Sequence, residues 1–152
     1  MKKMQLLAAG LLLTLVSMAQ KDPVHFTYKA ERLNAKTCIL RITAQIDAGW
    51  HIYSKDQPKE AISQPTKILL TKSPLFTPAG ALTEKGKKEK YEDKVAEIVQ
   101  YQYGGVVEYT QTLSLKTGAK ATVTGNITYQ ACTEESCNNP QTINFEVPVP
   151  VQ

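Results

Sequence analysis

The sequence predicts an all-β domain built as an antiparallel β-sandwich. Apolar and polar residues alternate along much of the chain with the period of two that β-strands require. Seven to nine short segments show this pattern, and turn-forming residues separate them at regular intervals. No amphipathic helix of useful length appears, and neither a repeat nor a shift in composition divides the chain. We therefore expect a single domain.

In chain order, the predicted strands are residues 24–30, 36–47, 50–54, 66–72, 94–101, 105–116, 120–131 and 141–149. Asp47, Ala48 and Gly49 predict a turn between the second and third strands. Residues 73–90 contain Pro, Gly and a lysine cluster, and we expect a solvated loop with at most a short strand. The last two strands are predicted to form a hairpin around a loop that contains two cysteines.

The first 19 residues are predicted to be a signal peptide. Two lysines precede a short apolar run, and Ser17 and Ala19 supply the small side chains that a signal peptidase recognises. The run is shorter than the roughly 18 apolar residues that a transmembrane helix needs. We expect cleavage after Ala19 and an exported mature domain, residues 20–152, with no transmembrane segment.

Charge and composition argue against several classes of ligand. Without Lys2 and Lys3 the 18 basic residues become 16, against 14 acidic ones. An excess this small, with Arg32 and Arg41 as the two arginines, favours neither nucleic acid nor an anionic membrane. All three methionines precede the predicted cleavage site, which excludes a Met-lined Cu(I) site in the mature domain.

The chain has three cysteines, and two of them are candidates for chemistry. Cys38 is in phase with the apolar face of its strand, so we expect a small buried hydrophobe. Cys132 and Cys137 flank a polar loop at a strand end, where their Cα atoms can come within the roughly 4.4–6.8 Å that a bridge needs. Closing so small a loop stabilises the fold by about 2 kcal/mol. The spacing therefore fits a structural clasp and a redox pair equally well.

A redox pair must react through a thiolate. Glu134 and Glu135 lie between the cysteines, and negative charge raises a thiol pKa, so neither cysteine is expected to be a strong nucleophile. A partner would then supply the reactive cysteine. A metal site completed by His25 or His51 is a third alternative, which the spacing does not require.

Three stretches of the sequence are GWHIYSKDQP, KYEDKV and ITYQACTEESCNNPQTINFEVPV. They resemble the N-terminal periplasmic domain of the thiol:disulfide interchange reductase DsbD, and the resemblance covers essentially the whole mature chain. The block with YQAC and a second cysteine is its most specific part. The resemblance implies an immunoglobulin-like sandwich in the periplasm, with no cofactor and no metal. It also implies thioredoxin-fold partners, namely a reductant and acceptors of the disulfide-isomerase or cytochrome-maturation type.

By this resemblance Cys132 and Cys137 are the catalytic pair. Cys132 is expected to form the mixed disulfide with a partner, and Cys137 to resolve it. Four residues separate the cysteines where the best-known members have five, so we expect a tighter loop. The sequence ends at Gln152 without the family's other domains, and we expect the reductant to be a separate protein. The competing hypothesis is a secreted binding module in which the pair is an inert clasp.

The resemblance also implies aromatic side chains around the disulfide. The segment HIY matches alternating tyrosines of the family and places His51 and Tyr53 beside the sulfurs, since residues i and i+2 of a strand share a face. A histidine at this position adds a titrating group near the thiols. Tyr91 is the candidate for an aromatic cap carried on a loop, with Glu92 and Asp93 beside it.

Overall fold

The computed structural model describes residues 22–116 and 120–151, so the predicted signal peptide, residues 1–19, lies outside the described residues. The described residues form nine strands and no helix, which confirms the all-β prediction. The strands are β1 (Val24–Asn34), β2 (Thr37–Ile46), β3 (His51–Tyr53), β4 (Lys67–Leu70), β5 (Phe76–Asp93), β6 (Ile98–Leu115), β7 (Thr122–Tyr129), β8 (Ala131–Cys132) and β9 (Gln141–Pro148).

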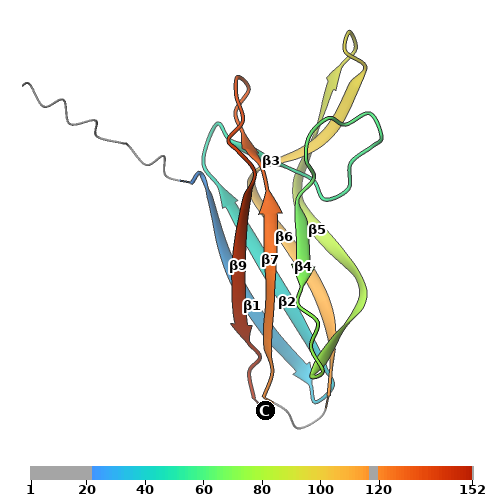
Figure 1. The fold of residues 1–152 in the computed structure, drawn as a ribbon, viewed down its shortest axis with the longest axis vertical. Helices are drawn as coiled ribbons and strands as arrows, with labels where there is room; N and C mark the ends of the chain where they lie inside the picture. Colours follow the sequence, from blue (N-terminus) through green and yellow to red (C-terminus); the bar gives the residue numbers. More distant parts are fainter. Residues whose placement is uncertain (1–21, 117–119, 152) are drawn as a thin grey trace, which may run out of the picture.

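Two antiparallel sheets pack face to face as an immunoglobulin-like sandwich (Figure 1). One sheet has the order β1-β2-β6-β3-β8, and β5 also pairs with β6; the other has the order β4-β7-β9. The long strand β6 organises the larger sheet, because residues 106–114 pair with β2 while Tyr103 and Gln102 pair with β3. The short strand β3 then pairs with β8, which carries the first cysteine of the loop.

Alternating side chains of both sheets fill the core. In β2, the residues predicted to face inward are at most 4% exposed, and they are Cys38, Leu40, Ile42, Ala44 and Ile46. Cys38 is a free, fully buried thiol, as predicted. Opposite them, Val123, Ile127 and Tyr129 of β7 are completely buried. Strict alternation in a strand with one dry face explains why the sequence identified β2 correctly.

Two predictions about strand boundaries are wrong. Residues 73–90 are mostly strand, because β5 runs for 18 residues along β6 and carries the lysine cluster on its exposed surface. Lysines along a sheet edge hinder pairing with another chain, and they also hide the alternation that identifies a strand. The segments 94–101 and 105–116 belong largely to one strand, β6, because Gly105 (φ 73°) bends it without ending it.

Three segments lie together at one end of the sandwich (Figure 1). They are the cysteine loop between β8 and β9, the far end of the β5–β6 hairpin, and the connection from β3 to β4. The predicted turn at residues 47–49 leads the chain into this end, where the Trp50 amide donates to the Asp47 carbonyl at 3.1 Å. Gly49 has a φ of 82°, which favours glycine.

Candidate functional site

Strand β3 connects the cysteine loop to the larger sheet. His51 lies directly opposite Cys132 in the β3–β8 register, and Ile52 points into the core with no exposed surface. His51 and Tyr53 therefore share the other face of the strand. Their rings are 5.4 Å apart at an interplanar angle of 79°, an edge-to-face contact.

Cys132 and Cys137 form a disulfide whose Cα atoms are 4.0 Å apart. The four residues between them form a tight turn, in which the Thr133 amide donates to the Ser136 carbonyl at 2.8 Å. The Thr133 hydroxyl accepts from the amides of Glu135 and Ser136 at 3.2 and 3.1 Å. A threonine at the start of a turn binds the following amides in this way, so the local sequence itself closes the loop.

The two sulfurs have different surroundings. Cys132 is fully buried, whereas Cys137 is exposed. The Tyr53 hydroxyl lies 3.4 Å from the Cys132 sulfur, to which it donates, and 4.0 Å from the Cys137 sulfur. An incoming thiolate can reach only the exposed sulfur in this conformation. The expected mixed disulfide on Cys132 is therefore not favoured by this conformation, because the β3–β8 pairing buries Cys132.

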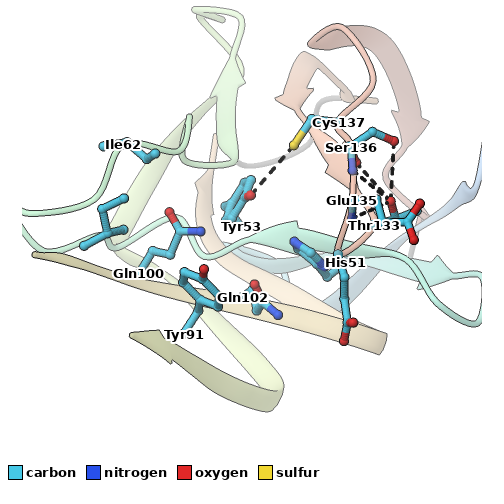
Figure 2. Close-up of a pocket in the computed structure, with 12 residues that line it drawn as sticks. His51, Tyr53, Ile62, Tyr91, Gln100, Gln102, Thr133, Glu135, Ser136 and Cys137 are labelled. Carbon is cyan, nitrogen blue, oxygen red and sulfur yellow. Dashed lines mark hydrogen bonds between the residues drawn. The ribbon is translucent and has the colours of Figure 1, made fainter. Parts of the chain in front are cut away.

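A groove of about 730 Å³ opens beside Cys137 (Figure 2). Its lining comes from β3, the β3–β4 connection, the β5–β6 hairpin and the cysteine loop, and comprises His51, Tyr53, Ile62, Tyr91, Ile98, Gln100, Gln102, Thr133, Glu134, Glu135, Ser136 and Cys137. The groove thus brings together residues that are as much as 86 positions apart in the chain, between 51 and 137. Cys137 lies on one wall, and the β5–β6 hairpin forms the opposite wall.

The residues predicted around Tyr91 lie on a strand instead of a loop. Tyr91 is 46% exposed and lines the groove on the wall across from the cysteine loop (Figure 2). Glu92 pairs with Lys90 at 2.8 Å, and Asp93 accepts from the amides of the hairpin turn. Neither Glu92 nor Asp93 lines the groove. Glu92 points to the face opposite to Tyr91, whereas Asp93 shares the face of Tyr91 but lies at the hairpin turn.

The titrating groups beside the disulfide are held in their neutral forms. Burial raises the pKa of the Tyr53 hydroxyl, and a hydrogen bond from Gln100 opposes this effect. Burial also lowers the pKa of His51, against the attraction of Glu89 and Glu134 for the charged form. Tyr53 is therefore a hydrogen-bond donor, and His51 an uncharged imidazole, near neutral pH.

The sequence reasoning missed Gln100. Gln100 is only 8% exposed, and its Oε1 atom has no hydrogen-bond partner in the described part of the chain. It lies beside Tyr53 in the groove (Figure 2). A glutamine between apolar residues of the predicted strand 94–101 was the available signal, since it is in phase with Ile98 on one face.

The sequence reasoning also missed a buried carboxylate on β5. Glu84 of β5 accepts from the Ser54 hydroxyl, from the Lys55 amide at 2.9 Å and from Lys88 at 2.8 Å. Burial acts to raise the Glu84 pKa, but the hydrogen bonds from Lys88, Ser54 and Lys55 outweigh it and hold the pKa below its usual range. Glu84 thereby anchors the start of the β3–β4 connection, which carries Ile62 to the groove.

Two further kinds of site are absent from the described part of the chain. Across residues 22–116 and 120–151, no three His, Cys, Asp or Glu side chains gather as ligands for a metal ion. The same residues contain no helix long and apolar enough to cross a bilayer.

Comparison with known proteins agrees with the sequence resemblance. The family model described as thiol:disulfide interchange protein DsbD, N-terminal, matches residues 16–148. The N-terminal periplasmic domain of ScsB from Proteus mirabilis has a TM-score of 0.55 and 13% identity over 88% of this chain and 49% of that one. The reduced DsbD N-terminal domain of Neisseria meningitidis has a TM-score of 0.47 and 18% identity, with 81% and 84% covered.

A third solved structure, the complex of the DsbD and PilB N-terminal domains from Neisseria meningitidis, has a TM-score of 0.44 and 17% identity, with 80% of each chain covered. At such identities the likeness to ScsB shows the fold alone, and this chain spans about half of that ScsB chain. No match is found among the curated proteins.

Proposed function

The chain belongs to the family of DsbD N-terminal domains, and from this premise we propose that it is a periplasmic thiol:disulfide interchange domain that acts on thioredoxin-fold partners. One observation carries the proposal: the disulfide lies at the mouth of a groove, with Cys137 exposed and Cys132 buried against Tyr53. Such a pair offers one sulfur for attack and a protected environment for the other. The family's periplasmic location and the predicted signal peptide support export.

The exchange begins when a partner thiolate attacks the Cys137 sulfur. The Cys132–Cys137 bond breaks, and its electron pair leaves on the Cys132 sulfur while a mixed disulfide forms between the partner and Cys137. The partner's second thiolate then attacks the partner sulfur of the mixed disulfide and releases Cys137. The partner is oxidised by two electrons, and this domain becomes a dithiol after taking up two protons. The same steps in reverse reduce an acceptor.

Tyr53 favours this chemistry through the leaving sulfur. Its hydroxyl donates to Cys132 in the disulfide, where sulfur is a weak acceptor, and the same donor faces the sulfur when it becomes a thiolate. Hydrogen bonds to charged groups contribute about 1.5–3 kcal/mol, against about 0.5–1.5 kcal/mol for neutral ones. The interaction therefore strengthens as charge develops, which is the condition for lowering the barrier.

The proposal is tested by trapping with single-cysteine variants in a Cys38→Ala background. Each variant is mixed with a thioredoxin that lacks its resolving cysteine and whose remaining cysteine carries an activated disulfide. We expect Cys132→Ala, which keeps exposed Cys137, to form the mixed disulfide at least about tenfold faster than Cys137→Ala, because access controls the reaction of a thiol. Equal rates, or faster reaction through Cys132, would contradict the assigned roles.

The same assay distinguishes exchange from an inert clasp. With both cysteines present and oxidised, the reduced thioredoxin variant should open the disulfide and accumulate as an adduct on Cys137. If no adduct forms while the domain stays folded, the pair is a structural clasp and the domain is a secreted binding module.

A further inference from the structure

The groove beside Cys137 carries negative charge without compensation from its own walls. Glu134 and Glu135 line it, and none of its lining residues is Lys or Arg, although the chain has 18 basic residues. Both glutamates are exposed, and neither carboxylate forms an ion pair within residues 22–116 and 120–151. An incoming group therefore meets two unpaired carboxylates next to the sulfur that it attacks.

Two ion pairs on the β5–β6 hairpin neutralise charges near the groove. Glu89, which influences His51, pairs with Lys87 at 2.9 Å, and Lys90 pairs with Glu92 at 2.8 Å. The remaining titrating groups that face the sulfurs, His51 and Tyr53, are uncharged near neutral pH. Among the residues that line the groove, the carboxylates are therefore those of Glu134 and Glu135, and both lie in the loop that carries Cys137.

A second polar group in the groove also lacks a partner. The Oε1 atom of Gln100 is buried and accepts no hydrogen bond in the described residues. Figure 2 shows the Gln100 side chain extending into the groove between Tyr53 and Ile62. A buried acceptor without a donor is unfavourable, so the groove lacks a donor at this point. The two carboxylates and this amide oxygen are all hydrogen-bond acceptors, so a ligand with N–H donors complements the groove.

The rim of the groove indicates a macromolecular ligand. Ile62 is 78% exposed on one side, Tyr91 is 46% exposed on another, and Val95 at the tip of the same hairpin is 97% exposed. Large exposed apolar side chains on the rim of a groove and close to it are typical of surfaces that bind proteins.

We propose that the groove binds a cationic segment of the partner polypeptide, one that carries Lys or Arg beside the partner's reactive cysteine. The inference rests on the proposed function, and it identifies the partners by the charge around their cysteine. The carboxylates attract such a segment as it approaches, which increases the rate of association more than the final affinity. A lysine or arginine beside the attacking cysteine also favours its thiolate form.

The charge requirement is tested with three small thiols that differ in charge: cysteamine, 2-mercaptoethanol and 3-mercaptopropionate. The rate of mixed-disulfide formation is measured by mass spectrometry after acid quenching and is normalised to each thiol's own thiolate concentration. The double variant Glu134→Gln/Glu135→Gln is compared with the wild type. Its control, Glu31→Gln/Glu146→Gln, removes the same charge from strands β1 and β9.

In the wild type we expect cysteamine to react faster than 3-mercaptopropionate. This ratio should fall about fivefold in Glu134→Gln/Glu135→Gln at low salt, should stay unchanged in the control, and should shrink at high salt. Equal ratios in the wild type and the double variant would overturn the inference and leave the proposed function intact. If 2-mercaptoethanol also fails to open the disulfide of the folded protein, both the inference and the proposed function are wrong.

Discussion

Replacing Tyr53 by Phe tests whether the buried wall of the site takes part in exchange. The substitution keeps the ring that packs against His51 and removes the hydroxyl that lies 3.4 Å from the Cys132 sulfur. The disulfide loses a weak hydrogen bond, whereas a thiolate on Cys132 loses a charge-assisted one. The difference between the two is about 1.5 kcal/mol.

That difference gives the expected change in rate. If the full charge develops on Cys132, 1.5 kcal/mol corresponds to roughly a tenfold change. If about half of the charge has developed in the transition state, the change is roughly threefold. We therefore expect reduction of the Tyr53→Phe disulfide to be about three to ten times slower than that of the wild type.

The assay is stopped-flow reduction by dithiothreitol at neutral pH, followed through the fluorescence of Trp50, the single tryptophan, which packs against the core next to β3. Tyr28→Phe is the matched control, because the Tyr28 hydroxyl is buried without a hydrogen-bond partner in the described chain. It should reduce at the wild-type rate. An unchanged rate for folded Tyr53→Phe, or the same slowing in both variants, would refute the reasoning.

Three further predictions concern stability. Burial holds the pKa of His51 below its ordinary value of 6.5, so the folded state binds the proton less readily than the unfolded chain. The contribution of neutral His51 to the stability of the fold is therefore complete above pH 6.5 and is lost as the pH falls below that value. We expect urea denaturation to show a smaller loss of stability between pH 7.5 and 5.5 for His51→Gln than for the wild type, and an equal loss would contradict this. Glu84→Gln should cost about 2 kcal/mol in the same assay, because a buried carboxylate with three donors is replaced, whereas Glu92→Gln in an exposed ion pair should cost under about 0.5 kcal/mol. Gly125→Ala should cost about 1–3 kcal/mol in thermal unfolding, since its Cβ would lie 2.7 Å from Phe145 Cζ. Gly104→Ala, whose Cβ would meet only the Trp50 carbonyl at 3.5 Å, is its control, and similar melting of the two variants would disprove the packing argument.

The sandwich was predictable because the burial of its core strands is visible in the local alternation of apolar and polar residues. In β2 one face is dry and the other is not, so apolar residues alternate strictly and even place Cys38 correctly. Strand β5 lacks such an alternation of apolar and polar residues. Its outer half, residues 84–93, is largely exposed and rich in lysine, and nothing in that composition separates an edge strand from a loop.

The site was predictable in its residues and not in its geometry. The two cysteines and the HIY segment were identified from the resemblance, but the exposure of each sulfur depends on how β3 pairs with β8, a contact between residues about 80 positions apart. Glu92 and Asp93 were placed beside the disulfide because they adjoin Tyr91 in sequence. On the strand, Glu92 faces the side opposite to Tyr91, and Asp93 lies at the hairpin turn, so adjacency in sequence brings neither residue into the groove.

The central claim is that Cys132–Cys137 exchanges electrons, and the reduction potential of this disulfide tests it most directly. The folded protein would be equilibrated in a graded series of dithiol buffers, and its thiols would be trapped and counted, with Cys38 replaced by Ala to remove the third thiol. Structural disulfides typically have potentials below about −300 mV. We predict a value clearly above this limit, reached by rapid exchange in the folded state. A value far below it, with reduction only on unfolding, would show that the pair is a structural clasp.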